Sequence, residues 1–135
     1  ELDVGIVPFS PLGRGQLTGA LNSLDELADD DARRSFPRFD KENFARNQAA
    51  VLALRSLAEA KGVTTSQLAL AWVLGQGDDV VPIPGTKRRS YLVDNVAAVH
   101  LDLTEDDRKS IEAAVPRESV SGQRYPEREA RTTGR

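Results

Sequence analysis

Apolar residues recur with helical spacing in four stretches of this 135-residue chain, and each stretch begins or ends at a residue typical of a helix boundary. The first stretch runs from Asn43 to Lys61, and Gly62 follows it. The second begins near Thr64, whose spacing to Gln67 is that of a capping box. The side chains that we expect to face inward are Val51, Leu54, Leu57 and Ala58 in the first helix and Leu68, Ala71 and Trp72 in the second.

The third helical stretch covers about Ser90 to Val99, and the fourth covers Leu103 to Val115. Thr104 is a favourable N-cap for the fourth helix, and Pro116 ends it. In the third helix we expect an inward-facing set made of Leu92, Val93, Val96 and Val99.

Two short apolar runs rich in β-branched residues predict strands, at Val4–Phe9 and Asp79–Gly85. Pro8 disfavours a central position for the first strand, because proline cannot donate to a sheet ladder. The order of elements is strand, long loop, two helices, strand, two helices and a polar tail. This alternation predicts an α/β fold with parallel strands.

Two strands cannot form a parallel sheet that is covered on both faces. A closed (β/α)₈ barrel has eight strands and typically ~250 residues, so we expect this chain to be the C-terminal part of such a barrel, with two parallel strands and about four helices. The strand ends IVPFSPLG and VVPIPG are alike, which favours neighbouring β/α units with loops on one rim. The chain contains no Met, even at position 1, so either a trimmed chain or the C-terminal piece of a longer protein is expected.

Composition narrows the possible partners. The chain carries 18 basic and 21 acidic residues, a net charge of −3, so nothing draws it as a whole toward nucleic acid or an anionic membrane. It has no Cys and a single His, His100, so we expect no metal site. No apolar run approaches the ~20 residues that span a bilayer. The N-terminus lacks a secretory signal pattern, and we expect a cytoplasmic protein.

Three consecutive cations, Lys87, Arg88 and Arg89, stand where the third helix should begin. The helix dipole disfavours a cation there by about 0.3–1 kcal/mol at an exposed site. One interpretation is a solvated surface patch, which is what most runs of charge are. The other is an anion bound at the helix start, where free N–H groups, the dipole and the cations act together. Gly85 would allow close backbone approach, and Thr86 would add a hydroxyl donor.

A second glycine-bearing loop, SPLGRGQLTG (Ser10–Gly19), follows the first predicted strand. If the two strands are neighbours, both loops meet on the rim where β/α folds bind ligands. The chain has no G-x-G-x-x-G sequence. The two loops therefore predict a nucleotide cofactor on a barrel rim rather than on a Rossmann sheet.

The sequences FSPLGRGQLTG and VVPIPGTKRRSYLVDNVAA resemble the two cofactor loops of the aldo-keto reductase family. The segments PRFDKENFARN, TTSQLALAWVL, LTEDDRKSIEAAVP and SGQRYPE are similar to family segments in the same order. The resemblance covers the chain from about Val4 to Pro126. It implies that residues 1–126 are the C-terminal portion of an aldo-keto reductase barrel and that residues 127–135 are a polar tail. It further implies NADP(H) as cofactor, a small-molecule carbonyl substrate, and a missing N-terminal part of the barrel as a partner.

The resemblance also implies a position on the cofactor for several residues. Phe9 falls where the family places an aromatic ring against the nicotinamide. Asp94 and Asn95 fall where the family contacts adenine, although Asp94 replaces the more usual Glu or Gln. The loop over the pyrophosphate is implied for Ser10, Leu12, Gly13 and Gly15, with Arg14 at its tip. The 2′-phosphate pocket, which implies NADP(H) rather than NAD(H), falls on Gly85, Thr86, Lys87 and Arg88.

Two further regions have expected places near the cofactor and the substrate. Arg38, in the long loop, is expected to approach the cofactor. Arg124 and Tyr125 are expected to cover the substrate pocket, since the family's C-terminal loop does so.

The family's catalytic groups, a Tyr acid tuned by Lys, Asp and His, belong to strands that would precede this chain. We therefore name no catalytic residue here and expect the chain to be inactive alone. The function expected is the cofactor-binding C-terminal part of an NADP(H)-dependent oxidoreductase that reduces aldehydes or ketones by hydride transfer. Two alternatives stay open: a non-catalytic NADPH-binding regulatory module of the same fold, and a phosphate-binding barrel enzyme with an unrelated reaction.

Overall fold

The structure, a computed structural model, describes residues 4–132. Within this range the chain is helical, with the α-helices α1 (Lys41–Ala60), α2 (Thr65–Leu74), α3 (Arg89–Ala97), α4 (Glu105–Ala114) and α5 (Glu127–Ala130). Four short 3₁₀ helices precede α1: η1 (Gly13–Thr18), η2 (Leu24–Glu26), η3 (Ala32–Ser35) and η4 (Pro37–Phe39). Two more lie between later helices, η5 (Ala98–His100) after α3 and η6 (Arg117–Ser119) after α4.

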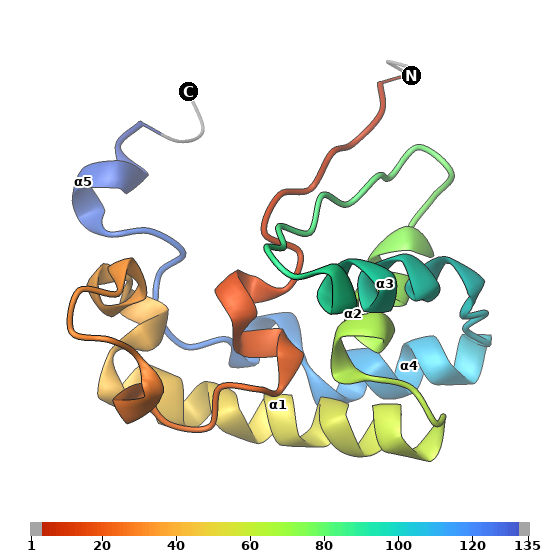
Figure 1. Cartoon of the computed structure of the whole chain (residues 1–135), viewed down its shortest axis with the longest axis horizontal. Helices are drawn as coiled ribbons and strands as arrows, with labels where there is room; N and C mark the ends of the chain where they lie inside the picture. The colour runs from red at the N-terminus through yellow and green to blue at the C-terminus, as the bar shows by residue number, and fades with distance from the viewer. Residues whose placement is uncertain (1–3, 133–135) are drawn as a thin grey trace.

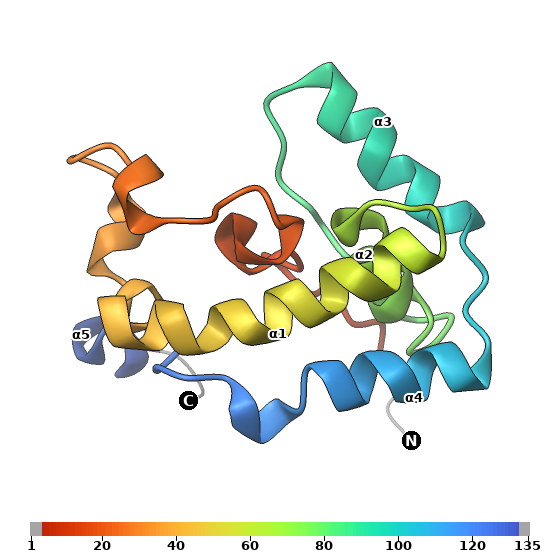
Figure 2. The ribbon, with the colours of Figure 1, turned by 90° about the horizontal axis from the view of Figure 1, so that it is seen from below.

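Helices α1, α2 and α4 pack together and form what we call the helical layer (Figures 1 and 2). Its interior buries apolar side chains from all three helices, namely Leu54, Ala58, Leu68, Ala69 and Ile111. Trp72 is half-buried and packs against this core, which is the role expected of an aromatic residue at helical spacing. The layer confirms three of the four predicted helices.

The two predicted helix starts in the helical layer are both capping boxes. The Thr64 side chain accepts from the Gln67 N–H while the Gln67 side chain accepts from the Thr64 N–H, at 3.1 and 3.0 Å. Thr104 and Asp107 form the same reciprocal pair at the start of α4. Gly75 caps the end of α2, and α4 ends one residue before Val115.

The long connection before α1 has a small core of its own. Its buried residues are Leu21, Leu27 and Phe39, to which Phe44 from the first turns of α1 is added, and the Phe39 and Phe44 rings stack with their centres 6.3 Å apart. Arg34 donates to the carbonyl oxygens of Leu24, Leu27 and Ala28 and so ties the turns of the connection together. The connection is therefore a folded unit, although its sequence shows no regular period.

The two predicted strands lie side by side and parallel, but no regular strand forms in residues 4–132. They meet at two isolated bridges, Ile6 to Val80 and Phe9 to Ile83. Three backbone hydrogen bonds join them, and the Val81 N–H donates to the Ile6 carbonyl oxygen at 2.8 Å. We call residues 4–9 and 79–85 the bridged segments. Their prolines carry no N–H, and each segment has only the other as a neighbour here, so the two regular strands that we predicted are not confirmed.

The prediction that α3 turns its apolar side chains inward is wrong. The helix itself forms, but Leu92, Val93, Val96 and Val99 are each more than half exposed. Helix α3 meets α2 and crosses over it (Figure 1). Nothing among residues 4–132 covers its outer apolar face, which is why helical spacing alone misassigned it.

The chain after α4, residues 117–132, which we call the tail, is attached to α1. The buried side chain of Asn47, in α1, donates to the Ser121 carbonyl oxygen at 3.0 Å and accepts from the Ser121 N–H at 2.8 Å. Residues 127–130 form the short helix α5 (Figure 1). Residues 133–135 of the predicted tail, like residues 1–3 of the predicted barrel portion, lie outside the described range.

Candidate functional site

The parallel bridges bring the two predicted cofactor loops to the same end of the bridged segments. Phe9 pairs with Ile83, so the loop that begins at Ser10 and the loop around Gly85 leave the segments together. The Ile83 N–H donates to the Pro8 carbonyl oxygen at 3.2 Å and fixes this register. The sequence prediction that the two loops are neighbours is thus confirmed.

The first loop has an unusual backbone. Ser10 and Arg14 have positive φ angles of 50° and 57°, and Gly15 has a φ of 95°. Left-handed angles cost a residue other than glycine of order 1–3 kcal/mol, and such residues cluster at binding sites. The Gly13 N–H donates to the Ser10 carbonyl oxygen and the Gly15 N–H to the Leu12 carbonyl oxygen, both at 3.0 Å. The result is a tight double turn rather than an open loop.

A cleft of about 580 Å³ lies between the first loop and α3, and we call it the shared cleft. Six of the predicted site residues line it: Leu12, Arg14, Gly15, Gly85, Asp94 and Asn95. A cavity of about 230 Å³ adjoins it and adds Ser10 to the lining. The two predicted loops therefore face one another across a single space. Phe9 and Gly13 do not line either cavity.

The predicted cations border a third cavity, of about 550 Å³, that shares Gly85 and Tyr91 with the shared cleft. Thr86, Lys87 and Arg88 complete its lining, and all three are exposed. Helix α3 starts here without a side-chain cap and without an acidic residue in its first turn. Its N-terminus therefore presents positive charge from both backbone and side chains.

The cleft contains residues that we did not predict as part of the site. Tyr91 receives a hydrogen bond from Arg88 Nη1 at 3.2 Å, and the guanidinium carbon of Arg88 lies 5.3 Å from the centre of its ring. Arg33 also lines the cleft, where it donates to the Arg14 carbonyl oxygen at 3.3 Å. The three-residue spacing from Arg88 to Tyr91 could have indicated their contact on one helix face. No local signal links Arg33 to Arg14.

Arg33 is held by Asp31 in an ion pair of 2.7 Å. Side-chain and backbone hydrogen bonds from Arg33 lower the pKa of Asp31 from 3.8 to about 2. Asp31, the last residue of the acidic stretch Asp29–Asp31, therefore holds Arg33 in place beside the cleft. Residues 4–132 contain no group of three or more His, Cys, Asp or Glu side chains that could hold a metal ion.

Asp94 is engaged within the chain. Both of its carboxylate oxygens accept from the Thr64 hydroxyl, at 3.0 and 3.2 Å. The same hydroxyl caps α2, so this contact ties α3 to the helical layer at the edge of the cleft.

Arg14 lines the cleft but also reaches toward the tail. Its guanidinium carbon lies 3.9 Å from the centre of the Phe36 ring and 5.4 Å from that of Tyr125. Arg124, next to Tyr125, lies 4.8 Å from the centre of the Phe9 ring. The Arg124 side chain therefore lies over Phe9, and the expected cover of a substrate pocket by Arg124 and Tyr125 stays a prediction. Arg38 donates to the Gly122 carbonyl oxygen of the tail at 3.4 Å, and it lines neither the shared cleft nor the two cavities that adjoin it.

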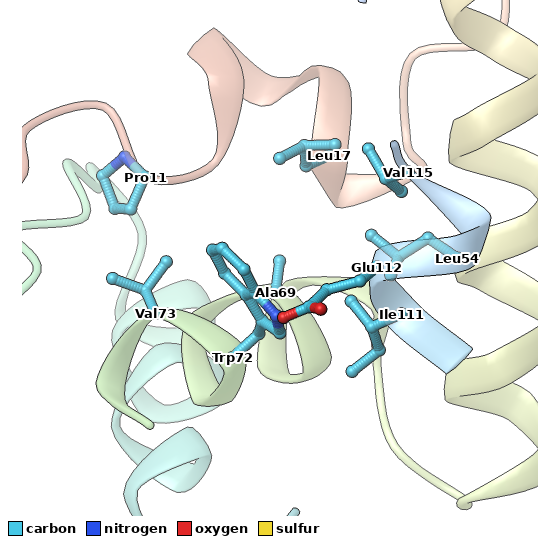
Figure 3. Close-up of a pocket in the computed structure, with 9 residues that line it drawn as sticks. All are labelled: Pro11, Leu17, Leu54, Ala69, Trp72, Val73, Ile111, Glu112 and Val115. Atoms are coloured by element: carbon cyan, nitrogen blue, oxygen red, sulfur yellow. The ribbon is translucent and has the colours of Figure 1, made fainter. Parts of the chain in front are cut away.

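A separate cavity of about 170 Å³ lies between the helical layer and the first loop, which contributes Pro11 and Leu17 to its lining. Figure 3 shows the Trp72 ring in the middle of it, with Glu112 reaching across from α4. The Trp72 Nε1–H is buried without a hydrogen-bond partner among the described residues. The remaining lining is apolar, apart from Glu112. No cation among residues 4–132 lines this cavity, in contrast to the shared cleft.

No helix within residues 4–132 is both long enough and apolar enough to cross a membrane.

Comparisons with known proteins identify relatives of the chain. The family model described as "Aldo/keto reductase family" matches residues 1–116. The chain is 46% identical over 126 residues to the aldo-keto reductase yakc of Schizosaccharomyces pombe, whose name specifies NADP(+). That match covers 93% of this chain and 37% of the relative. A probable aldo-keto reductase of Glycine max is 43% identical, with 93% of this chain and 36% of the relative covered.

Among solved structures, the chain is similar to the glycerol dehydrogenase AKR11B4 from Gluconobacter oxydans. The TM-score is 0.74 at 30% identity, and the match covers 88% of this chain and 36% of that one. The chain thus spans little more than a third of the length of the relatives it matches.

Proposed function

This chain belongs to the aldo/keto reductase family, and we propose that it is the cofactor-binding C-terminal part of an NADP(H)-dependent reductase of aldehydes or ketones. The observation that carries the proposal is the shared cleft, which is lined by both predicted cofactor loops. A relative named for NADP(+) supports the choice of cofactor.

The residues present fit a dinucleotide with three phosphates. Lys87 and Arg88 have no carboxylate partner within 4 Å among residues 4–132, so their charge is available to a ligand. Nothing lies within 4 Å of a side chain built at Gly85, so there is room for a bulky group beside the backbone. At the other wall, Arg14 supplies a guanidinium, which matches phosphate oxygens in pairs.

Each wall of the cleft then has a role. Gly85, Thr86, Lys87 and Arg88 would hold the ribose 2′-phosphate, with Asn95 and Asp94 beside the adenine. Asp94 would keep its bond to Thr64 and line the pocket rather than bind the base through its carboxylate. Ser10, Leu12, Arg14 and Gly15, which line the cavities, would hold the pyrophosphate together with Gly13 of the same turn. Phe9, which lines neither cavity, would support the nicotinamide from beside them. When bound, NADP(H) supplies a hydride to a carbonyl carbon.

The role of this chain in that reaction is to bind and orient NADP(H) rather than to transfer protons. The tight turn at Ser10–Gly15 is fixed by its own hydrogen bonds, so binding need not order it. Arg33, in the lining of the cleft, donates to the Arg14 carbonyl oxygen and holds the backbone of the turn. We assign no proton-transfer step to a described residue, and we propose that the remainder of the barrel supplies it.

The proposal is tested by NADPH fluorescence titration of the complete reductase and its Lys87→Glu and Arg88→Glu variants. A charge-assisted hydrogen bond contributes about 1.5–3 kcal/mol, so each reversal should weaken NADPH binding about tenfold or more. NADH lacks the 2′-phosphate, so its affinity should change much less. Arg46→Glu, at an exposed position on α1 away from the cleft, is the matched control and should bind NADPH as the wild type does.

Unchanged NADPH affinity in both variants would remove the site assignment. Carbonyl-dependent NADPH oxidation distinguishes a reductase from the non-catalytic alternative. Intact binding without oxidation, over a panel of aldehydes and ketones, would favour a regulatory module. Binding of phosphorylated compounds with no nicotinamide preference would favour the unrelated barrel enzyme.

A further inference from the structure

Three arginines gather where the tail meets the long connection, and we call Arg14, Arg38 and Arg124 the arginine cluster. The guanidinium carbons of Arg14 and Arg124 lie 5.4 and 5.8 Å from the centre of the same ring, that of Tyr125. Arg38 reaches the same place from the connection and contacts the tail backbone at Gly122. Two stretches far apart in the sequence thus bring their cations to one aromatic side chain.

The arginine cluster has no counter-charge of its own. Among residues 4–132, no carboxylate lies within 4 Å of any of the three guanidinium groups, whereas Arg33 and Arg131 each have one. Burial lowers the pKa of Arg38, and the charges of Arg124 and Arg14 lower it further. Like charges that are partly removed from water repel one another unless an anion joins them.

The surrounding structure holds this arrangement in place. The two hydrogen bonds from the buried Asn47 fix the tail at Ser121. Gly122 follows with a φ of 85°, and a side chain there would lie 2.9 Å from the Pro37 carbonyl oxygen. The close approach of the tail therefore requires glycine. Arg124 and Tyr125 come directly after this turn, so their position is built into the fold.

Two members of the cluster, Arg38 and Arg124, lie apart from the phosphate-binding residues of the proposed cofactor site, whereas Arg14 borders both places. Lys87 and Arg88 lie at the far cavity, beyond Gly85. Arg124 instead lies over Phe9, at 4.8 Å from the ring centre, which is the nicotinamide end under the proposed function. A substrate reaches the cofactor at that end. Arg38 and Arg124 line neither the shared cleft nor the cavities that adjoin it, so an anion held by them comes from another molecule than the dinucleotide.

We propose that Arg38 and Arg124, the two members of the arginine cluster outside the cofactor site, bind an oxyanion, a carboxylate or a phosphate, carried by the carbonyl substrate, so that the reductase prefers anionic aldehydes or ketones over neutral ones. This inference rests on the proposed function, because it names the substrate class of the same site. Guanidinium groups bind both oxyanions in a planar, two-point geometry. The Tyr125 and Phe9 rings would then flank the substrate between its anionic group and the nicotinamide.

The experiment compares matched substrates on the complete reductase. The probes are 4-carboxybenzaldehyde, 4-formylphenyl phosphate and the neutral methyl 4-formylbenzoate, each with saturating NADPH. The readout is the ratio of kcat/KM for an anionic probe to kcat/KM for the ester, which does not depend on the folded fraction of a preparation. The higher of the two anionic ratios identifies the oxyanion. In the wild type both should exceed one, and raised salt should lower them.

Arg124→Gln should lower the anionic ratio about tenfold or more, because it removes a charge-assisted contact. Arg124→Lys should restore part of it, since the charge returns without the fork. Arg128→Gln, at an exposed arginine four residues along the same tail, should leave the ratio unchanged. An unchanged ratio in Arg124→Gln would overturn the proposal. A loss of NADPH affinity in that variant, with equal effects on acid and ester, would assign the cluster to the cofactor and also overturn it.

A binding measurement keeps the two proposals separable. Terephthalate is titrated calorimetrically into the wild type, Arg124→Gln and Arg128→Gln, with and without NADP⁺. Binding that Arg124→Gln weakens about tenfold, and Arg128→Gln does not, supports the oxyanion site even if no carbonyl is reduced, in which case the reductase proposal alone fails. Absence of terephthalate binding by the wild type under both conditions would overturn the oxyanion site.

Discussion

The helical layer and the bridged segments differ in how completely they bury their apolar side chains. In the layer, Leu68 is 0% exposed and Leu54 is 2% exposed. In the bridged segments, Ile6 is 56% exposed and Val81 is 58% exposed. Both regions carry the same kinds of side chain, so hydrophobicity does not explain the difference.

The cause is how each region satisfies its backbone. A helix forms its backbone hydrogen bonds within itself, except at its ends, where the first N–H groups have no partner in the helix. The capping boxes at Thr64 and Thr104 satisfy such N–H groups at the starts of α2 and α4. A parallel strand depends on neighbours on both sides. The bridged segments have one another and lack donors at Pro8, Pro82 and Pro84, so they pair at two points only.

The comparison shows that the shared cleft is built on the bridged segments, the region whose apolar side chains are less completely buried. Its two loops leave the bridged segments at the Phe9–Ile83 bridge, and α3 continues from them with its apolar face uncovered. Under the proposed function, the rest of the barrel covers these surfaces. The helical layer would then be the part whose packing is complete within this chain.

The largest expected effect comes from comparing one buried residue with one exposed residue. Leu68→Ala should lower the free energy of unfolding by about 2–5 kcal/mol, because it leaves a cavity in a fully packed core. Val93→Ala, at a position 65% exposed on α3, should change it by less than about 0.5 kcal/mol in this chain. Urea denaturation followed by circular dichroism measures both.

The same pair in the complete reductase sharpens the comparison. If the barrel covers α3, Val93→Ala should become clearly destabilising there, while the effect of Leu68→Ala stays the same. Equal, small effects of Val93→Ala in both proteins would mean that the apolar face of α3 stays exposed, contrary to our view of the bridged region.

Much of the fold could be predicted from the sequence because helices are encoded locally. The boundaries at Thr64, Thr104 and Pro116 follow from side chains next to them in the chain. The family resemblance is confirmed by the match to residues 1–116. Our prediction of which way the apolar face of α3 points was wrong, because helical spacing identifies an apolar face but not what covers it. The degree of strand formation likewise depends on neighbours and not on the strand's own sequence.

The candidate site was predictable in its loops and less so in its contacts. Glycines and cations indicated the two loops, and ten of the twelve predicted residues line the three adjoining cavities. The bond between Asp94 and Thr64, and the approach of Arg124 to Phe9, join residues at least thirty positions apart. No local pattern encodes such contacts. The binding roles themselves stay predictions until the titrations above are made.

A smaller effect tests whether the tail belongs to the helical layer. Asn47→Ala removes both hydrogen bonds to Ser121. The N–H and the carbonyl oxygen of Ser121 then lose their partner, which should lower the free energy of unfolding by about 1–3 kcal/mol. The tail should then loosen, and the amide of Ser121 should exchange with deuterium faster than in the wild type. Gln76→Ala is the control, because this exposed amide lies just after α2 and its side chain donates to the Trp72 carbonyl oxygen in that helix. It should change neither the stability nor the exchange of the Ser121 amide by a comparable amount. Unchanged exchange at Ser121 would show that other contacts hold the tail.

The smallest expected effect is an acid-dependent one at the start of α4. Asp107 accepts from Lys61 Nζ at 2.8 Å and from both the N–H and the hydroxyl of Thr104, and the Lys61 bond contributes most to lowering its pKa from 3.8 to about 2. Because the folded-state pKa lies below the unfolded one, its stabilisation is complete above about pH 4 and is lost as pH falls toward 2. Asp107→Asn should therefore flatten the decline of the melting temperature between pH 4 and pH 2, whereas Asp78→Asn, at an exposed aspartate without an ion pair in the described range, should follow the wild type. If both variants decline as steeply as the wild type, the link between α1 and α4 through Lys61 and Asp107 does not stabilise the helical layer, and its stability would rest on apolar packing alone.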